Sequence, residues 1–125
     1  MKTVSGRVIA LILGVSILAF AANTFAGQFF TSVSAPWGQS IVEGMVYNVP
    51  AGANVEWEVD ASGPGGYAQI MLGGDLNVNI AASGSGVQQY YDVTSTSGGN
   101  IYYYLHAYTA YPELDSAYGM FYVGW

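Results

Sequence analysis

Asn54–Asp60 reads N-V-E-W-E-V-D and alternates strictly between apolar and polar side chains. Successive side chains of a β-strand point to opposite faces of a sheet, so this segment predicts a strand with one buried and one solvated face. The buried face would carry Val55, Trp57 and Val59, and the solvated face Glu56, Glu58 and Asp60. The stretch indicates a sheet protein.

Similar segments lie along the rest of the chain. Leu76–Ile80 repeats the alternation, and further strand candidates cover residues 28–34, 40–49, 67–72, 87–94, 100–108 and 118–125. Clusters of Gly, Pro, Ser and Asn separate them and predict turns at residues 50–52, 62–66, 73–75, 83–86 and 97–100. Seven to eight short strands at this spacing predict an all-β fold, an antiparallel, jelly-roll-like β-sandwich.

The N-terminus predicts an export signal. Lys2 and Arg7 precede a short apolar run, Val8–Phe20, and small residues follow it, which is the order of a signal peptide. The run is shorter than the roughly 20 residues that a membrane-spanning helix needs. We expect a cleaved signal peptide over residues 1–21, with a cut after Ala26 as the alternative.

The remaining residues, 27–125, are expected to form a single β-sandwich domain that is secreted, either extracellular or periplasmic. The chain has no cysteine, so no disulfide framework is possible. A small exported domain without cysteines is more typical of prokaryotes than of animals.

Charge excludes several classes of partner. Lys2 and Arg7 are the only basic residues besides His106, so their removal changes the formal net charge from −6 to −8. A chain without cations cannot neutralise phosphates, which excludes nucleic acid, and it is repelled by anionic membranes. Each carboxylate must therefore remain solvated, accept hydrogen bonds or meet a cation from outside.

The most unusual surface is predicted for Ile101–Tyr108. If one face of this strand (Ile101, Tyr103, Leu105, Ala107) is core, the other carries the ring side chains Tyr102, Tyr104, His106 and Tyr108. Strand geometry spaces them by about 7 Å. Such a row can stack on sugar rings or pack against a partner chain, because tyrosine has a flat apolar ring with a polar tip. The alternative is a central strand that is buried on both faces.

Two further aromatic residues are candidates for the same binding surface. Tyr90 shares a strand face with Gln88 and Asp92 and could extend the row. Trp37 stands in the Ala35–Gly38 turn, where it could contact a ligand or cover the core.

We expect at most one metal site, which would hold a structural calcium ion. Glu113 and Asp115 are spaced so that both carboxylates could reach one ion, with Asp60 and Asp75 as weaker candidates. Solvated loop acids are the alternative. His106 without any cysteine cannot form an ordinary zinc site, and no other cofactor is expected.

No enzyme is expected. The chain has no Cys nucleophile, and its single histidine has no recognisable Ser and Asp companions. Glu56 and Glu58 share a strand face, as the paired carboxylates of glycosidases can, but Asp60 continues the row as in a plain solvated face.

Tyr47–Val55, which contains a Val-Pro-Ala-Gly turn, resembles the opening of bacterial pre-peptidase C-terminal domains. Ser97–Leu105 is similar to their late glycine-then-aromatic strand, and Tyr118–Trp125 to their closing strand, so the resemblance covers residues 41–125. It implies a secreted jelly-roll-like sandwich, usually appended to exported enzymes, sometimes calcium-bound and substrate-binding. Tyr67–Ile70 replaces the acidic residue that usually opens the family's middle strand, and no ligand residue transfers from the family.

Two functions follow as expectations. The first is a secreted, non-catalytic binding module whose exposed tyrosines contact polysaccharide or a protein surface. The second is a self-associating extracellular fibre or matrix subunit, a homo-oligomer in which the apolar segment 28–34 joins a neighbour's sheet edge.

Overall fold

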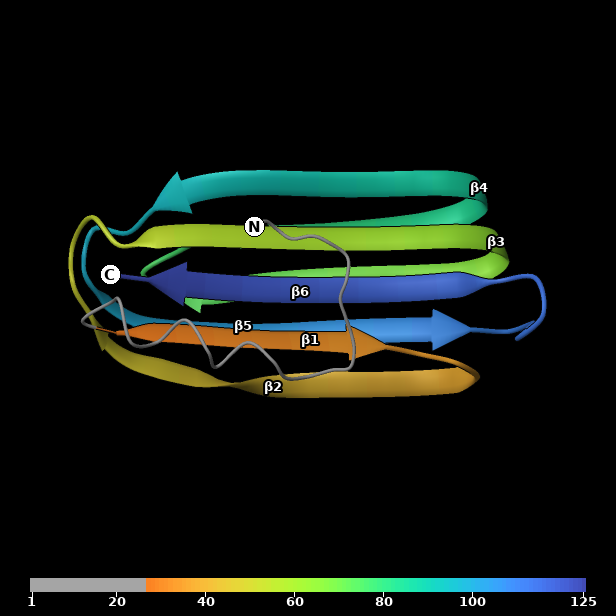
Figure 1. Cartoon of the computed structure of the whole chain (residues 1–125), viewed down its shortest axis with the longest axis horizontal. Coiled ribbons are helices and arrows are strands. Elements are labelled where there is room, and N and C mark those ends of the chain that lie inside the picture. Colours follow the sequence, from red (N-terminus) through yellow and green to blue (C-terminus); the bar gives the residue numbers. More distant parts are fainter. Residues whose placement is uncertain (1–26) are drawn as a thin grey trace.

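The computed structural model describes residues 27–125, and of Ser85 only the backbone. The predicted signal peptide, residues 1–21 or 1–26, lies outside the described residues. Figure 1 shows that the described residues form two layers of long antiparallel strands. The prediction of an all-β, antiparallel fold is confirmed.

Six strands make up the two layers. They are β1 (Gln28–Ser34), β2 (Gly38–Val49), β3 (Asn54–Gly74), β4 (Val78–Ser95), β5 (Gly99–Thr109) and β6 (Ser116–Gly124). Hydrogen bonds link them in the order β1-β6-β3-β5-β2, and β4 pairs with β3 along both of its halves.

The long hairpin β3–β4 belongs to both layers. Residues 54–62 of β3 pair with β6, while residues 67–74 pair with β5. The front layer of Figure 1 therefore contains β1, β6, residues 54–62 of β3 and residues 87–95 of β4. The rear layer contains β2, β5, residues 67–74 of β3 and residues 78–83 of β4. When the halves are counted separately, the sandwich has eight strand segments.

The hairpin changes layers at a glycine-rich bend. Gly63 pairs with Gly86 and Gly66 with Gly84, and the register shifts between these two pairs. Gly63 has φ +87°, a left-handed conformation that glycine adopts without a Cβ clash. The predicted turns at residues 62–66 and 83–86 do reverse the direction of the chain, since the hairpin folds back on itself there (Figure 1). Sequence reasoning did not predict that β3 and β4 stay paired through this reversal.

The predicted turns at residues 50–52, 73–75 and 97–100 do reverse the chain, and they gather at one end of the sandwich. The buried Thr96 donates its hydroxyl to Pro50 O (2.7 Å) and accepts from Ala53 N–H (3.2 Å). Asp75 accepts from the N–H groups of Ser97 (2.9 Å) and Gly98 (3.0 Å). These side chains hold together the connections β2–β3, β3–β4 and β4–β5.

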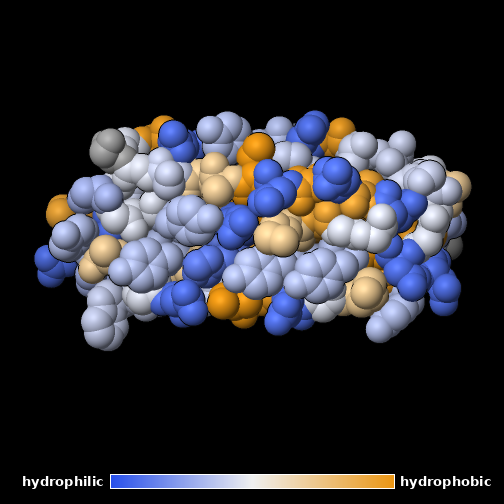
Figure 2. All heavy atoms as spheres, turned by 180° about the vertical axis from the view of Figure 1, so that it is seen from behind, coloured by the Kyte–Doolittle hydropathy of each residue, from blue (hydrophilic) through white to orange (hydrophobic). Residues whose placement is uncertain are grey.

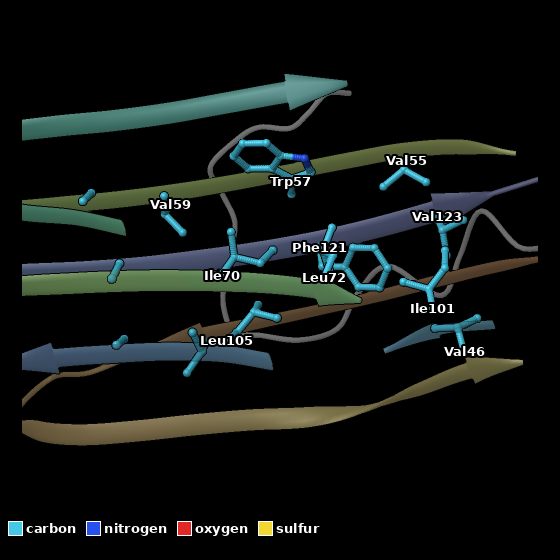
Figure 3. Packing of buried hydrophobic residues seen from close by; sticks show 14 of the residues in the cluster. Val46, Val55, Trp57, Val59, Ile70, Leu72, Ile101, Leu105, Phe121 and Val123 are labelled. Atoms are coloured by element: carbon cyan, nitrogen blue, oxygen red, sulfur yellow. The ribbon is translucent and has the colours of Figure 1, made fainter. Parts of the chain in front are cut away.

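The core lies between the two layers and follows the predicted alternation (Figure 3). Val55, Trp57 and Val59 of the opening stretch point into it, and Phe121 contacts Tyr103 with ring centroids 5.6 Å apart. Burial of each large side chain stabilises the fold by about 1.5–3 kcal/mol. The two outer faces are left for solvent or partners.

Candidate functional site

Strand β5 separates core side chains from the predicted row of rings. Ile101, Leu105 and Ala107 are fully buried. Tyr102, Tyr104 and His106 are half-buried on the opposite face, and Tyr108 is exposed. The prediction that one face of this strand is core and the other is reachable is confirmed, and the alternative of burial on both faces is excluded.

Neighbouring strands extend this row into a broad surface on the rear layer. On the β3 side, Tyr67 pairs with Tyr108, and Gln69 pairs with His106. On the β2 side, Glu43 pairs with Tyr104. We call this surface the tyrosine face, and its members are Tyr102, Tyr104, His106 and Tyr108 of β5, Tyr67, Gln69 and Met71 of β3, and Gln39, Ile41, Glu43 and Met45 of β2.

Figure 2 views the molecule from the rear layer. Aromatic rings in the pale blue of tyrosine are spread over this side, with strongly hydrophilic and strongly apolar residues between them. The surface is therefore mixed in character.

Side-chain hydrogen bonds fix the orientation of the rings. Tyr102 Oη donates to Glu43 Oε1 (2.9 Å), and Tyr67 Oη donates to Gln69 Oε1 (3.2 Å). The hydrogen bond to Glu43, followed by burial and nearby negative charge, raises the pKa of Tyr102. The phenol of Tyr102 is a donor in this contact.

His106 lies at the centre of the tyrosine face. Its Nε2 is 3.1 Å from Gln39 Oε1, and its ring meets that of Tyr67 edge-on at 5.6 Å between centroids. The Tyr104 ring lies 6.3 Å away on the other side. Gln69 continues the network by donating Nε2–H to Asn79 Oδ1 (3.1 Å) on β4. The face is thus held by contacts across four strands.

Sequence reasoning did not identify the β2 and β3 members of the tyrosine face. A signal for Tyr67, Gln69 and Met71 was present, because they alternate with the buried Ala68, Ile70 and Leu72. Ile41 and Met45 alternate with Val42, so apolar character alone could not decide which face of β2 is core.

Trp37 is strongly exposed, at 74% of its surface, so it does not cover the core. It precedes Gly38, which pairs with Thr109 at the end of β5 that carries Tyr108. Trp37 therefore stands at the Tyr108 end of the tyrosine face.

Tyr90 does not extend the row on β5. It lies in the half of β4 that belongs to the front layer, where it pairs with Val59. The bend at residues 84–86 separates it from the β4 residues that border the tyrosine face. The prediction that Tyr90 extends this surface is wrong.

The two candidate calcium ligands have different surroundings. Asp115 accepts hydrogen bonds from the N–H groups of Gly65 (3.0 Å), Ala110 (3.0 Å) and Tyr111 (2.8 Å). Partial burial would raise the pKa of Asp115, but these three donors outweigh it and the pKa is lowered. Glu113 is exposed.

The described residues hold no group of three or more His, Asp or Glu side chains suited to a metal ion. Both carboxylate oxygens of Asp115 already accept hydrogen bonds, which join the β5–β6 loop to the bend of β3. A calcium ion on Glu113 and Asp115 stays a prediction.

The paired carboxylates Glu56 and Glu58 lie on the outer face of the front layer. Glu56 accepts from Tyr91 Oη (3.0 Å), and Glu58 accepts from Gln89 Nε2 (2.9 Å). Both acids thus act as acceptors that fasten β4 to β3, which is one of the three fates expected for acids in a chain without cations.

No protein family and no curated protein matches this sequence. A solved structure of the infectious bursal disease virus Gx strain is similar to 81% of this chain and to 32% of its own chain, with 15% identity and a TM-score of 0.31. The chain thus spans about a third of that viral chain. Within residues 27–125 no helix is long and apolar enough to cross a membrane.

Proposed function

We propose that this chain is a secreted, non-catalytic binding module whose tyrosine face contacts a polysaccharide. The observation that supports this proposal is the placement of five ring side chains on one outer sheet surface, beside amide and carboxylate groups. They are Tyr67, Tyr102, Tyr104, His106 and Tyr108.

Sugars present flat patches of C–H groups ringed by hydroxyls, and the tyrosine face offers a partner for each. Tyrosine rings stack on the apolar patches, and their hydroxyls can exchange hydrogen bonds with those of the sugar. Gln39, Gln69 and Glu43 provide additional donors and acceptors between the rings. Ring spacing of about 7 Å along β5 suits a chain of sugars more than a single one.

The negative charge of the domain limits the polysaccharides that it can bind. Without lysine or arginine in residues 27–125, the face cannot pair with carboxylate or sulfate groups, and the net charge of the domain repels them. A neutral polysaccharide is therefore the proposed ligand, and a protein surface is the other ligand class consistent with an aromatic face.

Affinity electrophoresis through gels that contain neutral polysaccharides tests this proposal. The double variant Tyr104→Ala/Tyr108→Ala removes two rings from the centre and end of the row, and loss of their stacking should weaken binding by about tenfold or more. Tyr111→Ala is the matched control, because Tyr111 is exposed in the β5–β6 loop outside the sheet. Melting curves of all variants establish that they are folded.

Equal retardation of the double variant and the parent would show that sugars, if bound, bind elsewhere. No retardation by any neutral polysaccharide, together with capture of a protein that the double variant fails to capture, would assign the face to a protein partner.

The alternative function, a self-associating extracellular subunit, stays a prediction. Residues 28–34 form β1, which pairs with β6 along its whole length and has no second strand partner within the described residues. The exposed half of β4 offers another edge for self-association.

A further inference from the structure

The C-terminal half of β4 is exposed on both faces. Every residue from 86 to 95 is exposed, including the large apolar side chains Val87, Tyr90, Tyr91 and Val93. Figure 1 shows this segment along the upper rim of the molecule. It extends beyond the cover that the rear layer gives to the rest of the front layer, and β3 is its only strand partner within the described residues.

Two other free edges of the described fold, those of β2 and β1, are less open to pairing. β2 has Glu43 in its middle and a register shift between Val46 and Val49, with Asn48 at φ 57°. Bulges and charges of this kind protect sheet edges. β1 is short.

The exposed half of β4 has almost no such protection. Residues 87–95 contain no proline and no lysine, and Asp92 is their only charge. The segment is also held in an extended shape, because Tyr91 and Gln89 bond to Glu56 and Glu58 on β3. A regular, apolar and unpaired edge is a template for another strand.

We propose that residues 87–93 pair antiparallel with the same residues of a second copy, about a two-fold axis at Tyr90. In such a symmetric pair, residue i faces residue 180 − i of the partner and both lie on the same side of the sheet. The segment V-Q-Q-Y-Y-D-V is self-complementary in this register. Val87 faces the partner's Val93, Gln88 faces the partner's Asp92, and Gln89 faces the partner's Tyr91.

Charge favours this register over the one whose axis lies at Asp92. An axis at Asp92 would place the two carboxylates directly opposite each other, and like charges in that position destabilise a sheet. With the axis at Tyr90, Asp92 faces an amide that can donate to it. Asp92 would exchange its present hydrogen bond from the N–H of Val93 (2.8 Å) for this partner. Gln88 can retain its own contact, in which Oε1 accepts from Ser83 N–H (2.7 Å).

The remaining acids do not oppose the pairing strongly. Glu56 and Glu58 lie on β3, one strand away from the edge. Across the proposed interface they are at least about 14 Å from their copies, which is three strand spacings and more than the screening length at physiological salt.

The pair has a consequence that rests on the proposed function. A two-fold axis perpendicular to the front layer joins the two front layers into one sheet and leaves both rear layers on the same side. The two tyrosine faces would then point in a similar direction, so one long polymer could engage both and gain avidity.

Analytical ultracentrifugation of the protein as the cell produces it, without any polysaccharide, tests the assembly alone. A short strand pair buries less than a standard interface, so we expect a reversible dimer with a Kd on the order of micromolar. Val87→Lys/Val93→Lys places two lysines opposite two lysines and should dissociate the dimer. Val87→Glu/Val93→Lys places opposite charges together at the same positions and should restore it, and both variants have the same substitution opposite Glu56.

The difference in Kd between these two variants is expected to be about tenfold or more, from two cross-strand charge pairs. Tyr47→Lys/Leu114→Lys is the charge-matched control, since both residues are exposed and lie outside β4. Added lysines reduce the overall repulsion between two acidic copies. If only this overall charge mattered, the double-lysine variant of β4 and the control would both dimerise more strongly than the parent.

A parent protein that stays monomeric at millimolar concentration overturns the proposal, and so does a dimer that the Lys/Lys and Glu/Lys variants form equally well. Neither result touches the tyrosine face, whose test uses other residues and a polysaccharide. Failure of one proposal is therefore distinguishable from failure of the other.

Discussion

The carboxylate of Asp115 accepts a hydrogen bond from the backbone N–H of Gly65 at 3.0 Å, and thereby fastens the β5–β6 loop to the bend of β3. The same carboxylate accepts from Ala110 and Tyr111 within its own loop. In a domain without cations, backbone N–H groups take the place of a salt-bridge partner.

Asp115→Asn should therefore lower the melting temperature at neutral pH. Asparagine has one acceptor oxygen where aspartate has two, so at least one of the three N–H groups would face an amide donor. Glu113→Gln removes the same charge from an exposed position in the same loop and should change the melting temperature little. Equal melting temperatures for both variants and the parent would contradict the anchoring role.

The stability of the domain should depend on pH through Asp115 and Asp75. The hydroxyl and backbone donors of Ser97 and the N–H of Gly98 lower the pKa of Asp75 despite partial burial, and that of Asp115 is lowered by its backbone donors. A group with a lowered folded pKa contributes stability above its unfolded value of 3.8, and this contribution is lost as the pH falls through the folded value. Thermal melts across the acid range should show a weaker loss in Asp115→Asn than in the parent.

Gly63→Ala should destabilise the sandwich by about 1–3 kcal/mol or more. A side chain at this position would be strained at φ +87° and would meet Asp115 Cα at 2.8 Å. Gly86, its partner across the hairpin, has nothing within 4 Å of an added Cβ. Gly86→Ala should therefore change the free energy of unfolding by no more than about 0.5 kcal/mol, and denaturant titration of the pair measures the difference.

Thr96→Val should cost about 1–3 kcal/mol of stability at almost constant volume. The buried hydroxyl of Thr96 serves Pro50 O and Ala53 N–H, and valine leaves both without this partner. Thr94→Val makes the same change at an exposed site of β4 and should be nearly neutral. If both variants unfold at the same denaturant concentration, the hydroxyl does not hold the end of the sandwich together.

Tyr91 should ionise late in an alkaline titration. Burial, the hydrogen bond to Glu56 and the charges of Glu56, Glu58 and Asp92 raise its pKa from 10.0 to about 12. Its contribution to stability is complete below pH 10 and lost as the pH rises towards 12, because the folded state favours the neutral phenol. Tyr91→Phe should remove amplitude from the high-pH end of the ultraviolet absorbance titration, and Tyr111→Phe serves as the comparison. Superimposable curves of the two variants near pH 12 would contradict this assignment.

The strands and the core faces could be predicted because they depend on local alternation. Val55, Trp57 and Val59 point inward as their spacing indicates, and Ile101 and Leu105 do so on β5. The reversals at Ser62–Gly66 and Ser83–Gly86 could be predicted from their turn residues, but the continuous pairing of β3 with β4 through them could not. Turn residues mark where one chain segment folds back, and only the register shows that two strands fold back together.

The candidate site could be predicted along one strand and not across strands. Alternation within β5 places Tyr102 and Tyr104 on one face, but only the register shows that Tyr67 lies beside Tyr108. The same limit explains Tyr90, which the bend at residues 84–86 moves to the other layer. It also explains Asp115, whose acceptor role depends on Gly65, a residue distant in sequence.

The continuous β3–β4 hairpin also determines how the protein can come apart. Two uninterrupted strands run from one layer into the other, so neither sheet can be peeled off while the other stays whole. Loss of the front layer would pull the shared strands out of the rear one. The sandwich is therefore expected to melt in one cooperative step, without a half-open intermediate.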